Sequence, residues 1–399
     1  MKKKDDFFKE KKPWSIFKDR LLSGYLSAYF QKILRTRKPV NYFDCFAGKG
    51  RFEDGNLGSP LITLDVIEKV LEKTKEPSPI IRTYFIDSEY AKDLEKNLGG
   101  RTYTQIIAGR YEDKTQALLK NIGNENVFLY IDPYGPRCLN MDWFNDLIKS
   151  DFNSLEILLN FNATGFMRLA CKCIGIEFLE DDYFDGCEAE SYFTVKDAKG
   201  CATLNKIAGG DYWQKILIDF KERILTWNDT EIKLSRAYCA ELRKNYSYVL
   251  DFPIRVKEFI HTKYRMIFAT NNFEGCYLMA ENMFKQKEDL GIFQRQGQTT
   301  FLKETLDFEP INLEDAKVKF LTYIESVAGK ERLKEAVSKF YSIHGLICSP
   351  SDISDFIKEL ETQDKIKVMR KPEVDKAFKP RKFYKESNGN KIWLAKKND

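Results

Sequence analysis

Residues suited to methyl transfer follow an apolar run near the middle of the chain, in YIDPYGP (130–136). The run Asn126–Ile131 is typical of a buried strand, and in open α/β sheets the carboxyl ends of strands border the ligand crevice. Asp132 could accept hydrogen bonds from an exocyclic base amine, and Tyr134 could stack on an unstacked base. Pro133 restricts the backbone between them. The alternative is an ordinary turn, because Asp, Pro and Gly all favour turns.

Three other apolar runs end in residues that could hold a nucleoside. The first is followed by DCFAGKGRFEDG (44–55), whose glycines allow a ligand to approach the backbone. The second ends in Asp87, where doubly wound domains place an acid for ribose hydroxyls. The third ends in Gly109, with charged residues just after it. The predicted cofactor contacts are Asp44, Ala47, Gly48, Gly50, Asp87, Gly109 and Glu112, with Asp44 and Gly48 at the methionine end.

These strand ends distinguish between classes of nucleotide-binding protein. A P-loop is excluded because the pattern GxxxxGK[ST] is absent. An NAD-type dehydrogenase has no obvious use for a fourth strand that ends in Asp-Pro-Tyr. An S-adenosylmethionine methyltransferase that acts on an exocyclic amine does have a use for it.

Strands and helices alternate around these residues. Four helical patterns separate the first five strands, which predicts a doubly wound, parallel Rossmann-like sheet with right-handed crossovers. An amphipathic helix over 14–34 precedes the sheet, and a mostly helical insertion is expected over about 162–250. The predicted strands cover 40–45, 80–87, 104–108, 126–131, 155–161, 246–256 and 264–270.

The C-terminal part of the sequence has the outline of a winged-helix-like domain. Its predicted elements are helices over 313–327, 331–342 and 351–363 and strands over 366–370 and 391–395. In such a domain the third helix can enter a DNA groove while the wing touches phosphate; docking to another protein is the alternative. The predicted organisation is a basic segment and helix (1–38), a methyltransferase-like domain (39–290), a linker (291–310) and a winged-helix-like domain (311–399).

Composition excludes several other classes of protein. The nine cysteines form no CxxC pair, so neither a zinc ribbon nor a disulfide framework is expected, and reduced thiols are typical of the cytosol. With only two histidines, a His-rich metal site or a Ser-His-Asp triad is not expected. The sequence begins without the pattern of a secretory signal and contains no apolar run of membrane-spanning length. We therefore expect a cytoplasmic protein with no metal site.

Charge is distributed unevenly along the chain. Residues 1–38 carry 12 Lys/Arg and 4 Asp/Glu, and residues 365–399 also carry 12 and 4. Each end therefore has a net charge of 12 − 4 = +8, and the stretch between them has 5 − 16 = −11. Basic ends around an acidic body predict binding to a polyanion. The alternative is a pair of solvated, lysine-rich ends.

Several sequence blocks together resemble the bacterial three-Cys-motif partner proteins (TcmP). The resemblance covers about 14–285 and implies a methyltransferase-like Rossmann fold, S-adenosylmethionine as cofactor and a three-cysteine, radical-SAM-like partner protein. The Asp-Pro-Tyr-Gly block also resembles the D/N-P-P-Y/F motif of amino-methyltransferases. The blocks are DCFAGKGRFEDGNLGSPL, YFID, YIDPYG, LLNF, GGDYW and YRMIFAT.

The chain departs from the methyltransferase pattern at three places. Tyr134 stands where the second proline of the motif is usual, and the loop over 50–59 is longer than the usual glycine turn. Arg110 stands where an acid often contacts adenine, so Glu112 or Asp113 would have to replace that acid.

The sequence hypothesis is an S-adenosylmethionine-dependent methyltransferase of an exocyclic base amine in DNA or RNA, with adenine N6 favoured. A phage-defence or mobile-element operon is the expected context. The alternative is a non-catalytic nucleic-acid-binding partner protein that keeps a nucleotide-binding crevice.

Overall fold

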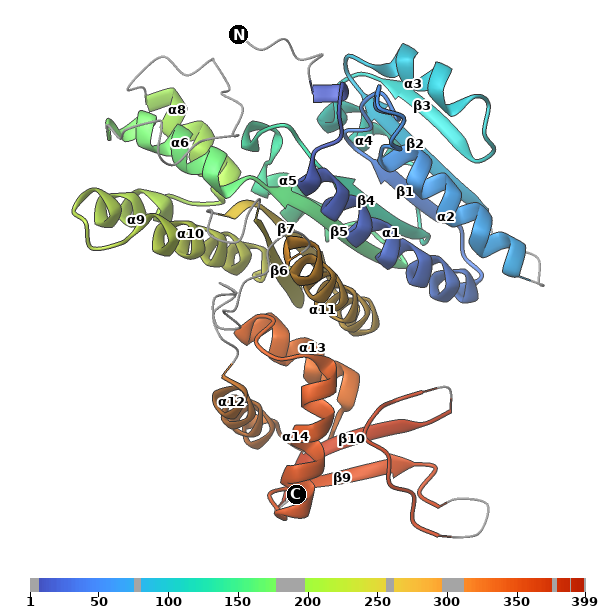
Figure 1. The fold of residues 1–399 in the computed structure, drawn as a ribbon, viewed down its shortest axis with the longest axis vertical. Helices are drawn as coiled ribbons and strands as arrows, with labels where there is room; N and C mark the ends of the chain where they lie inside the picture. Colours follow the sequence, from blue (N-terminus) through green and yellow to red (C-terminus); the bar gives the residue numbers. More distant parts are fainter. Residues whose placement is uncertain are drawn as a thin grey trace. The chain divides into compact units, whose positions relative to one another are not determined.

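The chain forms two compact units, Met1–Asn271 and Asn272–Asp399. In this computed structural model, the described residues are 7–74, 80–176, 198–255, 262–295, 312–374, 379–387 and 389–397. Figure 1 shows the elements of both units. The sequence did not predict helix α11 (Phe273–Arg295), most of which falls within the predicted range 39–290. It belongs to the second unit, where it packs against α13 (Leu333–His344). Most of the predicted linker lies outside the described residues.

The first unit is built on a seven-stranded sheet with the order β3-β2-β1-β4-β5-β7-β6. Strands β1 to β5 are parallel, whereas β7 is antiparallel to both of its neighbours. The predicted doubly wound sheet is therefore confirmed for the first five strands. The strands are β1 (Val40–Asp44), β2 (Ile81–Asp87), β3 (Thr104–Ala108), β4 (Asn126–Ile131), β5 (Ser154–Phe161), β6 (Tyr248–Arg255) and β7 (Thr262–Thr270).

Central strands of this sheet are buried on both faces. Every residue of β1 and β4 is buried, as expected for parallel strands covered by helices on both sides. Successive β4 side chains point to opposite faces of the sheet. Phe128 packs against aromatic residues of α1 on one face, while Val127 and Leu129 belong to the hydrophobic core on the other face. Alternate residues of one short run thus build two separate hydrophobic layers.

Helices α1 (Pro13–Ile33) and α2 (Ser59–Lys73) lie side by side on one face of the sheet (Figure 1). Tyr25 and Tyr29 of α1 contact Phe128, with ring centroids 5.8 and 5.3 Å apart. The described part of the predicted helical insertion is helical; residues 177–197 lie outside the described ranges. The other helices of this unit are α3 (Ala91–Leu98), α4 (Tyr111–Leu119), α5 (Met141–Leu147), α6 (Ala163–Ile174), α8 (Ala198–Ala208), α9 (Tyr212–Lys221) and α10 (Trp227–Leu242).

The second unit contains the three helices and the two strands expected over 311–399, together with α11 and a short additional strand. Its three-stranded sheet has the order β8-β10-β9. Its elements besides α11 are α12 (Leu313–Ser326), β8 (Glu331–Arg332), α13, α14 (Pro350–Thr362), β9 (Ile366–Lys371) and β10 (Lys391–Lys396). Within the described parts of the chain, no helix is long and apolar enough to cross a membrane.

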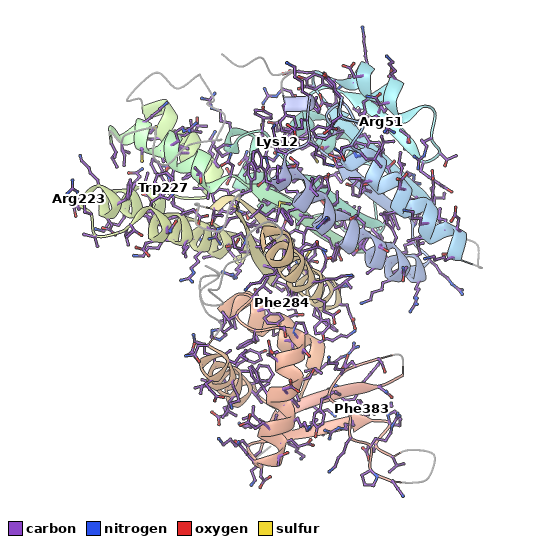
Figure 2. The ribbon with its side chains drawn as sticks, viewed as in Figure 1. Lys12, Arg51, Arg223, Trp227, Phe284 and Phe383 are labelled. Carbon is purple, nitrogen blue, oxygen red and sulfur yellow. The ribbon has the colours of Figure 1, made fainter. Side chains whose placement is uncertain are left out.

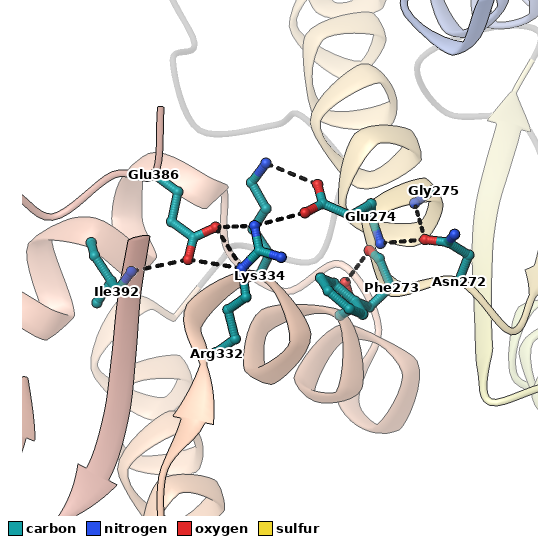
Figure 3. A network of polar contacts seen from close by, with 9 residues as sticks. Asn272, Phe273, Glu274, Gly275, Arg332, Lys334, Glu386 and Ile392 are labelled. Carbon is teal, nitrogen blue, oxygen red and sulfur yellow. Dashed lines mark hydrogen bonds and ion pairs between the residues drawn. The ribbon is translucent and has the colours of Figure 1, made fainter. Parts of the chain in front are cut away.

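A network of charged residues ties the loop between β9 and β10 to the rest of this unit (Figure 3). The Arg332 guanidinium lies 3.0 Å from the Glu386 carboxylate and 2.8 Å from that of Glu274, which also pairs with Lys334 at 3.0 Å. Glu386 accepts a further bond from the backbone N–H of Ile392 at 3.0 Å. The base of the loop is therefore held by an ion pair to Arg332 of β8, and the same arginine also pairs with Glu274 of α11.

A buried acid of β5, Glu156, contacts α1 and makes the stability of the first unit depend on pH. Tyr25 donates a 2.5 Å hydrogen bond to Glu156, and burial raises the pKa of Glu156 to about 7. A carboxyl whose pKa is raised by folding destabilises the folded state once it must ionise. The wild type should therefore lose stability as pH rises from about 4.5 to about 7.

We expect Glu156→Gln to remove the contribution of Glu156 to this pH dependence, because a glutamine oxygen can still accept the Tyr25 hydrogen bond without ionising. Thermal melts at pH 5 and pH 8 check it: the melting temperature of the variant, relative to wild type, should be higher at pH 8 than at pH 5. An equal difference at both pH values would contradict the prediction.

Candidate functional site

Three polar side chains lie at the carboxyl edge of the parallel sheet. Asp44 ends β1 and is in register with Phe85 of β2 and Tyr130 of β4. Asp132 follows β4, and Asn160 is the second-to-last residue of β5. The sheet thus brings together residues that lie far apart in the sequence, as predicted for the first and fourth strand ends.

Asp44 is fully buried and only half satisfied. Its Oδ1 accepts a 3.3 Å hydrogen bond from the backbone N–H of Phe46, while its Oδ2 has no hydrogen-bond partner among the described residues. Burial raises the pKa of Asp44 to about 7. The Ser59 side chain and the Phe46 N–H lower this pKa, and the nearby carboxylates of Asp132 and Asp87 raise it. A buried acceptor without a partner is costly, so this oxygen is well placed to receive a donor from a ligand.

Asp132 is held by three side chains. The ammonium of Lys18 lies 2.8 Å from Oδ1 and 2.7 Å from Oδ2, Asn160 donates to Oδ1 at 2.8 Å, and Tyr130 donates to Oδ2 at 3.3 Å. Lys18 also lies over the ring of Tyr264, 4.8 Å from its centroid. The carboxylate is therefore the centre of a hydrogen-bonded cluster rather than a loop residue facing water.

Sequence reasoning missed Lys18, although a signal for it exists. Lys18, Leu22, Tyr25 and Tyr29 follow one another at spacings of three or four residues, which places the lysine on the buried stripe of α1. A lone charge on an apolar stripe indicates a buried partner. Asn160 was also missed as a site residue; its side chain is 1% exposed, and its Oδ1 has no hydrogen-bond partner among the described residues.

Asp87, the predicted ribose acid, binds the turns around it. Its Oδ2 accepts from the backbone N–H of Gly48 at 2.9 Å, and its Oδ1 accepts from those of Glu89 and Tyr90 at 2.8 and 2.7 Å. A carboxylate offers about four acceptor positions, so roughly one is left for another donor. Asp87 therefore connects the loop after β1 with the loop after β2.

Glycines of the loop after β1 adopt conformations that other residues rarely adopt. Gly48 has φ +59° and Gly50 has φ +74°. A Cβ on Gly48 would lie 3.0 Å from the ring of Phe8, so the close approach that this glycine allows is made by the N-terminal segment. Ala47 is buried and donates a 3.0 Å backbone bond to Ile86. The first, second and fourth strand ends therefore share one edge with this loop.

The remaining predicted residues lie around this edge. Pro133 is buried, whereas Tyr134 is 46% exposed and its ring contacts that of Phe7 with centroids 5.5 Å apart. The backbone N–H of Gly109 bonds to Asp87 at 3.0 Å, and Glu112, in the first turn of α4, pairs with Arg110 at 3.2 Å. In the described part of the chain, no group of three or more His, Cys, Asp or Glu residues could hold a metal ion.

Comparison with known proteins gives distant structural likenesses. No protein-family model and no curated protein matches the sequence. The plantazolicin methyltransferase BamL, in complex with a triazolic desmethylPZN analog and SAH, aligns with 65% of this chain and 85% of its own at 12% identity and a TM-score of 0.27. A chain described as a Zn-dependent alcohol dehydrogenase from Rhodobacter sphaeroides aligns with 63% of this chain and 97% of its own at 12% identity and a TM-score of 0.25.

Both TM-scores are low, so the fold class rests on the order of the strands. A mostly parallel seven-stranded sheet with helices on both faces and a reversed β7 is consistent with a Rossmann-like methyltransferase fold. The class that the fold defines is therefore a mixed α/β protein with a polar cluster at the carboxyl edge of its sheet.

The ion pair of Lys18 and Asp132 gives a prediction about stability. Both side chains are largely buried, with exposed fractions of 9% and 19%. Asp132→Ala leaves a buried ammonium without its partner and should lower the free energy of unfolding by about 3–5 kcal/mol. The double variant Lys18→Met/Asp132→Ala removes both charges and should recover most of this loss. The coupling free energy between Lys18 and Asp132 can be measured by urea unfolding of wild type, the two single variants and the double variant. Losses that simply add in the double variant would contradict the predicted coupling.

Proposed function

We propose that this chain is an S-adenosylmethionine-dependent methyltransferase that acts on an exocyclic base amine of DNA or RNA, with adenine N6 favoured. The observation that carries the proposal is a pair of buried acceptor atoms, Asp44 Oδ2 and Asn160 Oδ1, on either side of Asp132 at the carboxyl edge of the sheet. Neither atom has a hydrogen-bond partner among the residues that the structure describes. Unsatisfied buried acceptors at this edge fit a ligand with several N–H donors.

The residues present fit such a cofactor at two points. The Asp44 carboxylate would hold the α-ammonium of the methionine part, and the remaining acceptor position of Asp87 would bind a ribose hydroxyl. When bound, S-adenosylmethionine supplies an electrophilic methyl group on a sulfonium. An ammonium beside Asp44 would also offset the cost of burying its charge.

Asp132 supports an amine as the methyl acceptor, because it already binds nitrogen donors. Its oxygens accept from the Lys18 ammonium and from the Asn160 amide. A target amine would take the place of one of these donors and would be oriented by the carboxylate with its lone pair free. Tyr134 is sufficiently exposed to stack on an unstacked base.

A polyanionic substrate is supported by cations of the second unit. Lys371, Lys382 and Lys391 are exposed at the β9–β10 hairpin. In contrast, Lys11 and Lys18 at the other basic end are buried and paired with acids, so they contribute less to phosphate binding than their number predicts. We propose that the second unit is winged-helix-like and that its hairpin contacts phosphates.

A second candidate function is a non-catalytic partner protein of the three-Cys-motif system, in which the crevice is retained without methyl transfer. It is favoured by the Lys18–Asp132 ion pair, which occupies the acid that an amine would need. The two candidates differ in whether the methyl group of S-adenosylmethionine is transferred to a nucleic acid.

Calorimetric titration with S-adenosylmethionine tests the first candidate. Wild type should bind, and Asp44→Asn should weaken binding by about 1.5–3 kcal/mol, because a charge-assisted hydrogen bond is lost. In a methyl-transfer assay on DNA and RNA pools, Lys18→Met/Asp132→Ala should retain cofactor binding but lose transfer. If wild type binds S-adenosylmethionine but transfers no methyl group to either pool, the non-catalytic candidate is favoured.

Salt dependence tests the role of the hairpin. If Lys382 and Lys391 contact phosphates, replacing both with Gln should reduce the slope of log affinity against log salt for duplex DNA by roughly 1–2, since each neutralised phosphate contributes about 0.9. Lys120→Gln, an exposed lysine at the end of α4, is the matched control and should leave the slope unchanged. An unchanged slope in the double variant would argue against the hairpin as a phosphate contact.

A further inference from the structure

Residues Phe7–Lys12, here called the strap, are fastened to the loop after β1. The carbonyl of Phe8 accepts from the backbone N–H of Glu53 at 2.8 Å, and the backbone N–H of Lys11 donates to Asp54 Oδ2 at 2.8 Å. The Lys11 ammonium also contacts the carbonyl of Leu57. Figure 2 labels Lys12, at the end of the strap, and Arg51, in the loop to which the strap is fastened.

The ring of Phe8 fills the space over the glycine turn. It is 8% exposed and lies 4.9 Å from the ring of Tyr90 and 5.7 Å from that of Phe52, measured between centroids. An ideal Cβ on Gly48 would lie only 3.0 Å from its Cζ. Gly48 is also the residue whose N–H binds Asp87, so the ring covers the place where the loop meets the predicted ribose acid.

The ring of Phe7 lies against Tyr134, in the loop after β4. Its centroid lies 5.5 Å from that of Tyr134, the predicted stacking residue, and 5.8 Å from that of Phe52. Two consecutive residues of the strap thus contact both a predicted cofactor residue and the predicted base-stacking residue.

We propose that the strap competes with the cofactor for this crevice, so that the N-terminal segment is autoinhibitory. This rests on the proposed function, because it assumes that S-adenosylmethionine binds beside Gly48 and Asp87. A lid that closes over a bound ligand would leave room between its ring and the glycine backbone. Here the ring of Phe8 fills the space over Gly48 that a Cβ would need, so the ring and a ligand cannot occupy that position together.

Competition of this kind lowers the apparent affinity for the cofactor. Only the fraction of molecules with an open strap can bind, and the apparent Kd equals the intrinsic Kd divided by that fraction. Two substitutions should open the strap independently. Phe8→Ala removes the ring over Gly48, and Asp54→Ala removes the acceptor of the Lys11 backbone N–H without altering a residue that faces Gly48.

Titration of the full chain with S-adenosylhomocysteine, followed by calorimetry, tests the proposal. Phe8→Ala and Asp54→Ala should each bind several-fold more tightly than wild type. Glu10 is an exposed strap residue that pairs with Lys12; Glu10→Gln is the control and should bind as wild type does. Unchanged or weaker binding by both opening variants would overturn the competition.

Hydrogen exchange gives a second readout that does not depend on affinity. Saturating S-adenosylhomocysteine should increase exchange at the backbone N–H groups of Glu53 and Lys11, because their bonds to the strap and the loop are broken. Decreased exchange there would show that the strap closes over the ligand as a lid, and it would overturn the proposal. If neither wild type nor any variant binds, the proposed function itself fails, a result distinct from binding that the variants do not tighten.

Discussion

The first unit depends on the ion pair that joins Lys18 of α1 to Asp132 at the end of β4. It fixes the N-terminal helix against the same edge of the sheet at which the polar cluster lies. Because both charges are largely buried, each needs the other, and the position of α1 is coupled to that of the Asp-Pro-Tyr loop. The feature that we expected to act on a substrate is therefore also part of what holds the fold together.

Buried acids around α1 show that this arrangement is not optimised for stability alone. Burial raises the pKa of Asp19 to about 6 and those of Asp44 and Glu156 to about 7. Glu156 has the Tyr25 hydroxyl as donor and Asp19 has the Lys11 ammonium nearby, which explains their presence structurally. Asp44 Oδ2 has no such partner in the described part of the chain, and this is why it is the strongest indication of a ligand.

The second unit assigns different roles to charges that look alike in the sequence. Arg332 and Arg370 are paired with Glu386 and Glu361, so they stabilise the hairpin and its attachment to α14. Exposed lysines of the hairpin, such as Lys382, are the ones that can meet a polyanion. Net charge along a segment therefore overstates how much of it is available for binding.

The sequence by itself determined the alternation of strands and helices, because apolar runs and helical periodicity are local patterns. It also placed Asp44, Asp87 and Asp132 at strand ends, since a residue that follows a buried parallel strand must lie at the carboxyl edge. Only the tertiary structure decided which atoms these acids contact. The pairing of Lys18 with Asp132 and the covering of Gly48 by Phe8 join residues separated by 114 and 40 positions, through side-chain contacts that no local pattern encodes.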